Sequence, residues 1–176
     1  MFSNPVKNLK AFALREDNIV ADLGAGTGYY SVAAGQMVPK GKVYAVEVVK
    51  DFLTTIKNKV REAHLSNVEC LWGNVEKLGG TKIGDNVVDA VIASNILFQV
   101  ENKAKFIEET KRILKPKGKV LLIDWNSGLS GGTPVVKLGG AIPKNKAREM
   151  FETKGFVLER DIDAGAHHYG MILTKN

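Results

Sequence analysis

The sequence is short of cysteine and of long apolar runs. Cys70 is the only cysteine among 176 residues, so no disulfide can form within the chain. Every apolar run is shorter than the roughly 18 residues of a membrane span, and residues 1–14 contain no apolar core of the signal-peptide kind. These features argue against a disulfide-stapled miniprotein, a membrane-spanning protein and a secreted protein. We therefore expect a cytoplasmic protein.

Apolar and charged residues occur in the proportions of an ordinary globular protein. Hydrophobic residues make up 44% and charged residues 25% of the chain, which excludes a disordered or collagen-like protein. The length suits a single domain, 1–176, and neither a repeat nor a linker interrupts it. The net charge of +6 permits an acidic partner without requiring one. We expect a monomer or a homodimer.

Short apolar runs alternate with helical patterns along the whole chain. Strands are expected at residues 18–23, 42–47, 68–72, 87–93, 119–124, 156–160 and 169–174. Helices are expected at 29–38, 51–63, 102–115 and 144–154, with a turn at 116–118 and a glycine-rich loop at 126–142. Within the second helix, Phe52, Ile56 and Val60 recur at a spacing of four and mark its inner face.

This alternation predicts an α/β fold with a mostly parallel sheet of seven strands and helices on both faces. Right-handed crossovers bring the carboxyl ends of parallel strands to one edge, and ligands of such sheets bind there. Functional residues should therefore follow strands. The basic residues Lys111, Arg112, Lys115, Lys117 and Lys119 lead into a strand instead, so we expect them on the opposite edge, as a solvated surface.

A glycine-rich turn follows the first strand. Gly24, Gly26 and Gly28 occupy its first, third and fifth positions, and Tyr29 stands at the sixth, where the dinucleotide fingerprint needs glycine. Glycines there let backbone N–H groups approach a ligand, and Glu47 ends the next strand, where a carboxylate can accept both hydroxyls of a ribose. The pair indicates a nucleoside-bearing ligand; the alternative is a tight turn with a solvated Glu47.

Five segments in order resemble the motifs of class I S-adenosylmethionine-dependent methyltransferases, most closely the ubiquinone/menaquinone-biosynthesis type. The segments lie at residues 20–28, 45–47, 71–78, 88–95 and 112–120. The resemblance implies a Rossmann-like, doubly wound sheet whose last strand is antiparallel. It also implies S-adenosylmethionine as cofactor and S-adenosylhomocysteine as product.

The same resemblance implies binding residues by position. The glycine loop would pass the methionyl part of the cofactor, Glu47 would hold the ribose and Val48 would pack on adenine. Asn74 stands where the family usually has aspartate, and an amide oxygen can still accept a hydrogen bond from the adenine amino group. The full set of candidate cofactor residues is Asp22, Gly24, Ala25, Gly26, Gly28, Tyr30, Glu47, Val48, Gly73, Asn74, Val75, Ser94 and Asn95.

Methyl transfer from a sulfonium is an in-line displacement, so alignment and exclusion of water can supply much of the catalysis. A base is needed only if the acceptor must lose a proton. His168, His167 and Asp124 are the candidates, because all three should lie near the carboxyl edge. The alternative for the histidines is an ordinary turn position. No metal is expected.

The acceptor is expected to be a small molecule or a lipid-like molecule. An Asn-Pro-Pro-Tyr segment of the kind used on adenine amino groups is absent after the fourth strand, and one cysteine argues against an arsenic acceptor. Lys137, Lys144, Lys146 and Arg148 could attract an anionic acceptor, and the loop at 126–142 could cover the site. RNA or protein methylation, and a non-catalytic S-adenosylmethionine-binding module, remain alternatives; nucleic acid is possible but not favoured.

Overall fold

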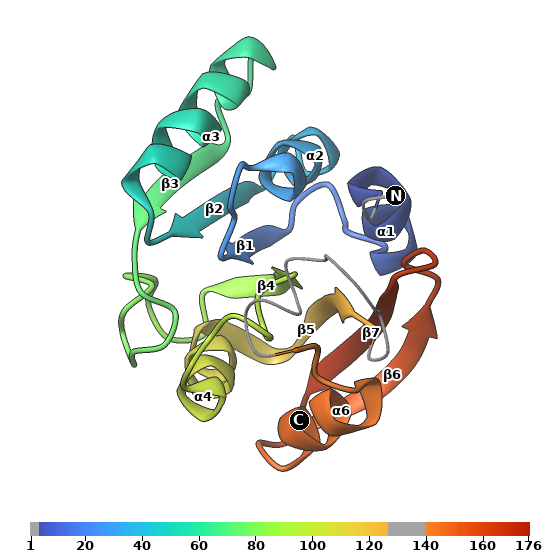
Figure 1. Cartoon of the computed structure of the whole chain (residues 1–176). Helices are drawn as coiled ribbons and strands as arrows, with labels where there is room; N and C mark the ends of the chain where they lie inside the picture. Colours follow the sequence, from blue (N-terminus) through green and yellow to red (C-terminus); the bar gives the residue numbers. More distant parts are fainter. Residues whose placement is uncertain (1–3, 127–139) are drawn as a thin grey trace.

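The protein, described by a computed structural model over residues 4–126 and 140–176, is built on a seven-stranded sheet of order β3-β2-β1-β4-β5-β7-β6 (Figure 1). The strands are β1 (Ile19–Leu23), β2 (Lys42–Glu47), β3 (Val68–Trp72), β4 (Val88–Ser94), β5 (Leu114–Trp125), β6 (Phe156–Ile162) and β7 (His168–Lys175). Strands β1 to β5 pair in parallel, and β7 runs antiparallel to both β5 and β6. The expected architecture is confirmed.

The described helices cover both faces of the sheet (Figure 1). They are α1 (Pro5–Phe12), α2 (Tyr29–Met37), α3 (Lys50–Glu62), α4 (Lys103–Ile113) and α6 (Lys144–Glu152). One apolar cluster joins the sheet to Phe106 of α4 and Phe151 of α6, and a second joins it to Leu9 of α1 and Ala34 of α2. The central strands read as apolar throughout because both of their faces are buried.

Helix α1 was not predicted, although its signals are local. Asn4 caps it by accepting a hydrogen bond from the Lys7 backbone N–H at 3.1 Å, and Pro5 occupies the first turn. The helix packs on α2, where the Asn8 side-chain amide donates to the Tyr30 hydroxyl at 2.8 Å. An eight-residue helix gains its stability from such packing rather than from propensity, which is why the sequence pattern alone did not reveal it.

The turn expected at 116–118 is instead part of β5. Leu114 already pairs with Val88, and pairing resumes at Lys119 opposite Ala90 after a register shift. Lys117 adopts a left-handed φ of 64° in this irregular stretch, and Pro116 costs no ladder hydrogen bond there. Helix α4 therefore ends at Ile113 rather than at residue 115, and β5 is twelve residues long.

The part of the chain that the structure describes contains no helix long and apolar enough to cross a membrane. Most of the glycine-rich loop expected at 126–142, together with Lys137 within it, lies outside the described residues. Lys144 and Arg148 lie on α6, where they form ion pairs with Asp161 at 2.6 Å and Glu152 at 2.7 Å. The charge expected to attract an anionic acceptor is therefore largely paired.

Candidate functional site

The glycine turn bends sharply between β1 and α2. Gly24, Gly26 and Gly28 all have a left-handed φ, of 70°, 53° and 82°. A Cβ atom at Gly24 would collide with Cδ1 of Ile96, and one at Gly28 would lie 2.9 Å from Ile56. A Cβ atom at Gly26 would meet nothing within 4 Å. Gly24 and Gly28 are therefore required by packing. Gly26 instead faces open space, which leaves its backbone accessible to a ligand.

Glu47 joins this turn to the end of β2. Its Oε2 accepts a hydrogen bond from the Gly26 N–H at 2.8 Å, and its Oε1 accepts from the N–H groups of Val48 and Val49 at 2.8 and 2.9 Å. The residue is only 7% exposed. The turn and the carboxylate therefore converge, as the spacing predicts. A carboxylate has about four lone-pair positions, so part of its accepting capacity remains beyond these three bonds.

Asp22 is buried directly beneath the turn. It is 2% exposed and accepts a hydrogen bond from the Ser31 hydroxyl at 2.6 Å. Burial raises the pKa of Asp22 from 3.8 to about 7, and the nearby charge of Glu47 adds to that rise. A positively charged group bound at the turn would favour the ionised form of this carboxyl. The base of the turn is thus suited to a cationic ligand.

A cleft of about 300 Å³ opens between the turn, the end of β2 and the segment after β3. Val48, Val49 and Phe52 line it and are 54%, 44% and 39% exposed, which is unusual for large apolar side chains. Asn74 also lines the cleft, and its Oδ1 accepts a hydrogen bond from the Glu76 N–H at 2.9 Å. The cleft therefore combines an apolar wall with polar groups, as expected of a site for an adenine and a ribose.

The structure brings together part of the predicted cofactor set. Seven of its residues line this cleft: Gly24, Gly26, Glu47, Val48, Gly73, Asn74 and Val75. Asp22, Ala25 and Gly28 lie in or beneath the same turn without lining the cleft. Tyr30 points toward α1 instead, since its hydroxyl accepts from Asn8. The cleft is also lined by four residues that were not predicted, namely Val49, Phe52, Ile96 and Gln99.

A second group of polar side chains gathers where β4, β5 and β7 meet the same edge. Asp124 is fully buried and accepts hydrogen bonds from the N–H groups of Trp125 at 2.8 Å and Phe98 at 3.3 Å. Burial raises the pKa of Asp124 to about 6. Burial, followed by the charge of Asp124, raises the pKa of the Tyr169 phenol. The two groups are therefore close, on paired positions of β5 and β7.

Several buried polar atoms in this group have no hydrogen-bond partner among the described residues. They are Ser94 Oγ, Asn95 Oδ1, Tyr169 Oη and both ring nitrogens of His168. Asn95 also has a left-handed φ of 55°, a conformation that asparagine tolerates better than most residues. Buried polar atoms are normally satisfied, so a concentration of unsatisfied ones at one edge marks a place for a ligand.

The predicted catalytic residues do not share one face of the sheet. His168 begins β7, stacks on Trp125 with ring centroids 4.3 Å apart and is 4% exposed. Tyr169 belongs to the apolar cluster on the α4 and α6 side of the sheet. Asp124 pairs with Tyr169, and paired antiparallel residues share a face, so Asp124 points to the same side. His168 precedes Tyr169 in β7 and therefore points to the opposite side. Burial and the neighbouring His167 lower the pKa of His168, while half-exposed His167 lies in the link between β6 and β7.

Comparison with known proteins decides the family. A family model described as a methyltransferase domain matches residues 21–122, which is more than half of the chain. The chain belongs to this methyltransferase family. The matched segment contains the glycine turn, Glu47 and the cleft, and S-adenosylmethionine is the methyl donor of the family.

Individual relatives agree with this assignment. The methyltransferase is 29% identical to a SAM-dependent methyltransferase from Aquifex aeolicus, with a TM-score of 0.88 over 99% of this chain and 91% of that one. It is 30% identical over 119 residues to an arsenite methyltransferase of Halobacterium salinarum, covering 66% of this chain and 30% of that protein. It is 28% identical over 117 residues to a demethylmenaquinone methyltransferase of a Geobacillus strain, covering 66% and 49%. The chain thus spans half or less of the length of these curated relatives.

The residues of the methyltransferase fit its donor. S-adenosylmethionine carries an adenine, a ribose and a cationic methionyl end. The exposed apolar wall and the remaining acceptor capacity of Glu47 lie along the cleft and suit the adenine and the ribose, and the carboxyl of Asp22, buried beneath the turn, suits the cationic end. The open face of Gly26 leaves room for the ligand between them.

Proposed function

We propose that the protein transfers the methyl group of S-adenosylmethionine to a small, largely apolar acceptor bound where the carboxyl ends of β4 and β5 meet the amino end of β7. The observation that carries the proposal is the group of buried polar atoms without partners among the described residues, on Ser94, Asn95 and Tyr169. Tyr169 pairs with the buried residue Asp124 on one face of the sheet, whereas Ser94 pairs with Ile123 and lies on the other face, so the group spans this edge from both sides. A small acceptor with one or two polar groups can satisfy these atoms in a way that a flat macromolecular surface cannot.

The donor side of the proposal assigns one task to each part of the cleft. Val48 and Phe52 pack on the adenine, Glu47 accepts from the ribose and the Gly26 backbone lies against the methionyl chain. Asp22 supplies the negative charge that favours the cationic end. The bound donor supplies an activated methyl group on a sulfonium. The protein's contribution is to hold that methyl group in line with the acceptor and to exclude water.

Asp124 is the proposed proton acceptor when the acceptor is a hydroxyl or an acidic carbon. With a pKa of about 6 it is mostly ionised at neutral pH, yet it is basic enough to take a proton as the new bond forms. In this proposal the Tyr169 hydroxyl donates a hydrogen bond to the acceptor's oxygen. The histidines remain candidates, and His168 would need an acceptor that reaches the α1 side of the sheet.

The relatives narrow the acceptor class. The Geobacillus relative is described as acting on demethylmenaquinone, a lipid-like ring compound, and the apolar setting of Asp124 suits such a molecule. An arsenic acceptor, implied by the name of the Halobacterium relative, is not proposed. Cys70 is the only cysteine, lies on the edge strand β3 and has a pKa that burial raises, so a reactive set of thiols is lacking.

The test is transfer of label from methyl-labelled S-adenosylmethionine to a panel of hydroxylated naphthalenes and benzenes, to total RNA and to a protein extract. We expect label in a ring compound. Asp124→Asn should lower kcat by about 10² to 10⁴, the range for loss of a general base. Tyr169→Phe should act mainly on the KM of the acceptor.

The controls separate chemistry from folding. Both variants should bind S-adenosylhomocysteine within twofold of the parent, and Thr54→Ala on the exposed side of α3 should leave every readout unchanged. His168→Ala measured in parallel distinguishes the histidine from Asp124 as proton acceptor. Label found only in RNA or protein, or an unchanged kcat for Asp124→Asn, would overturn the assignment.

A further inference from the structure

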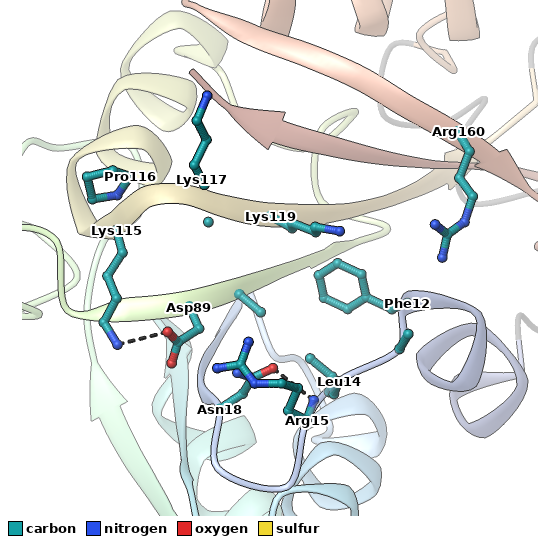
Figure 2. A pocket seen from close by; sticks show the side chains of 13 residues that line it. Phe12, Leu14, Arg15, Asn18, Asp89, Lys115, Pro116, Lys117, Lys119 and Arg160 are labelled. Carbon is teal, nitrogen blue, oxygen red and sulfur yellow. Dashed lines mark hydrogen bonds and ion pairs between the residues drawn. The ribbon is translucent and has the colours of Figure 1, made fainter.

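A larger cavity lies at the opposite edge of the sheet from the donor cleft. It encloses about 480 Å³ between the starts of β4 and β5, the end of α1 and the segment that joins α1 to β1 (Figure 2). This volume falls within the ~300–1,000 Å³ of typical small-molecule sites. Phe12 and Leu14 form its apolar part. The proposed reaction does not use this cavity.

Five cationic residues and one carboxylate line the cavity, and the side chain of Lys117 extends away from the others in Figure 2. The cations are Arg15, Lys115, Lys117, Lys119 and Arg160, and the carboxylate is Asp89. Asp89 is already satisfied, because it accepts from Lys115 Nζ and from the Ile19 N–H, each at 2.8 Å. Burial opposes its ionisation, but these two bonds prevail and lower its pKa. It therefore adds no unbalanced negative charge to the cavity.

The nearby acidic residues do not balance the remaining cations. Glu159 alone pairs with both Lys119 and Arg160, each at 2.7 Å. In Figure 2 these two side chains extend toward one another beside the Phe12 ring. Arg15 pairs with Asp17 through Nε at 3.1 Å, which leaves both terminal nitrogens of its guanidinium as donors. Positive charge therefore predominates in this concave site.

A buried amide provides an independent indication of a ligand. Asn18 lines the cavity and is 6% exposed. Its Oδ1 accepts from the Arg15 N–H at 2.9 Å, but its Nδ2 has no partner among the described residues. A buried donor without an acceptor is unfavourable, and in a cavity of this charge the missing acceptor would be an anionic oxygen.

We propose that this cavity binds a small organic anion, with its phosphate or carboxylate group held by Arg15, Lys119 and the Asn18 amide and its apolar part against Phe12. The five residues of β1 separate Asn18 from the glycine turn, a length of about 16 Å, so donor and anion can be bound together. A membrane surface is not the favoured partner, because docking through this edge would turn the acceptor site away from the lipid.

The test is titration calorimetry on the full chain saturated with S-adenosylhomocysteine, using inorganic phosphate, pyrophosphate, citrate and adenosine monophosphate as probes. Sodium chloride at matched ionic strength is the blank. We expect saturable binding of at least one probe with a Kd of about 1 mM or lower. Tighter binding of adenosine monophosphate than of phosphate indicates a nucleotide as the source of the anion, and equal binding indicates the free anion.

Variants locate the binding. The double variant R15Q/K119Q should weaken the anion at least tenfold, whereas K57Q/R61Q, which removes the same charge from exposed positions of α3, should not. Asn18→Asp keeps an oxygen that can accept from the Arg15 backbone N–H, but it replaces the unpaired Nδ2 donor with a second carboxylate oxygen. This variant should therefore abolish anion binding. Affinity for S-adenosylhomocysteine should stay within twofold in every variant, which also shows that each variant is folded. Equal anion affinity in R15Q/K119Q and K57Q/R61Q, unchanged affinity in Asn18→Asp, or heats no larger than those of sodium chloride would overturn the proposal.

Discussion

Replacing Asp22 with asparagine is expected to stabilise the ligand-free protein above neutral pH. The pKa of Asp22 is raised by burial from 3.8 to about 7. The folded protein therefore retains a proton that the unfolded chain has lost between these two values, so stability falls as pH rises through that window and is lowest above it. The ionised carboxyl then costs at most about 4 kcal/mol, at about 1.4 kcal/mol for each pKa unit. Asparagine does not ionise, so the variant is free of this destabilisation.

The assay is urea unfolding of the parent and of Asp22→Asn between pH 4 and pH 8. Asparagine retains an oxygen that can accept from Ser31, so the variant should fold with that hydrogen bond intact. The difference in free energy of unfolding should be largest at pH 8 and small near pH 4. Each kcal/mol corresponds to about 2–4 °C in Tm for a chain of this size. Asp124, whose pKa is also raised, titrates in both proteins and so cancels from the difference.

The same substitution should weaken donor binding. We expect the Kd for S-adenosylmethionine to rise about tenfold to hundredfold, equivalent to about 1.4–2.8 kcal/mol. In the parent, protonation of Asp22 competes with the cationic ligand, so affinity should improve from pH 6 to pH 8, and this dependence should vanish in the variant. A variant that is no more stable at pH 8, or a stability difference that does not change with pH, would refute the reasoning.

Three further predictions concern the turn and the core. Gly24→Ala should destabilise the fold, because the new Cβ would collide with Ile96. Gly26→Ala should lower the free energy of unfolding by only about 1–2 kcal/mol, because of its left-handed backbone, and should act mainly on donor affinity. Thermal melts measure the first effect and calorimetry the second. Glu47→Gln removes one strong acceptor of the turn, so the Kd for S-adenosylhomocysteine should rise at least tenfold, and an unchanged Kd would exclude this residue from the site. Burial opposes ionisation of Glu109, but hydrogen bonds from Arg112 and Thr81 prevail and lower its pKa from 4.5 to about 2. The ionised carboxylate therefore adds about 3 kcal/mol to the free energy of unfolding above pH 4.5, and this contribution is lost as the pH falls toward 2. Glu109→Gln should abolish this acid-dependent part of the stability, measured by urea unfolding at several pH values.

The meeting of the glycine turn with Glu47 was predictable because parallel strands must end at a common edge. The length of each strand, the crossover rule and the position of the acidic residue determine it without knowledge of side-chain packing. The apolar wall of the cleft was not predictable in the same way. Phe52 and Ile56 share one helical stripe, yet Ile56 is fully buried and Phe52 is 39% exposed. Phe52 lies in the first turn of α3, where it lines the cleft instead of joining the core.

The face of each catalytic candidate also required the structure. The sequence places His168 just before the last strand, in the link at the carboxyl edge, whereas the strand begins at His168 itself. Because side chains alternate along a strand, His168 and Tyr169 must point to opposite faces once His168 belongs to the strand. His168 consequently stacks on Trp125, away from Asp124 and Tyr169. Burial of Asp124 likewise depends on packing that periodicity does not reveal.

The reversal of β7 has a consequence for how this enzyme could diversify. Because β7 runs against its neighbours, its first residues, rather than its last, reach the working edge beside β5. In the proposed arrangement the donor is recognised by the first half of the sequence and the acceptor partly by a short hairpin tip near its end. Exchanging that tip would change the methyl acceptor of the enzyme while leaving its binding of S-adenosylmethionine unchanged.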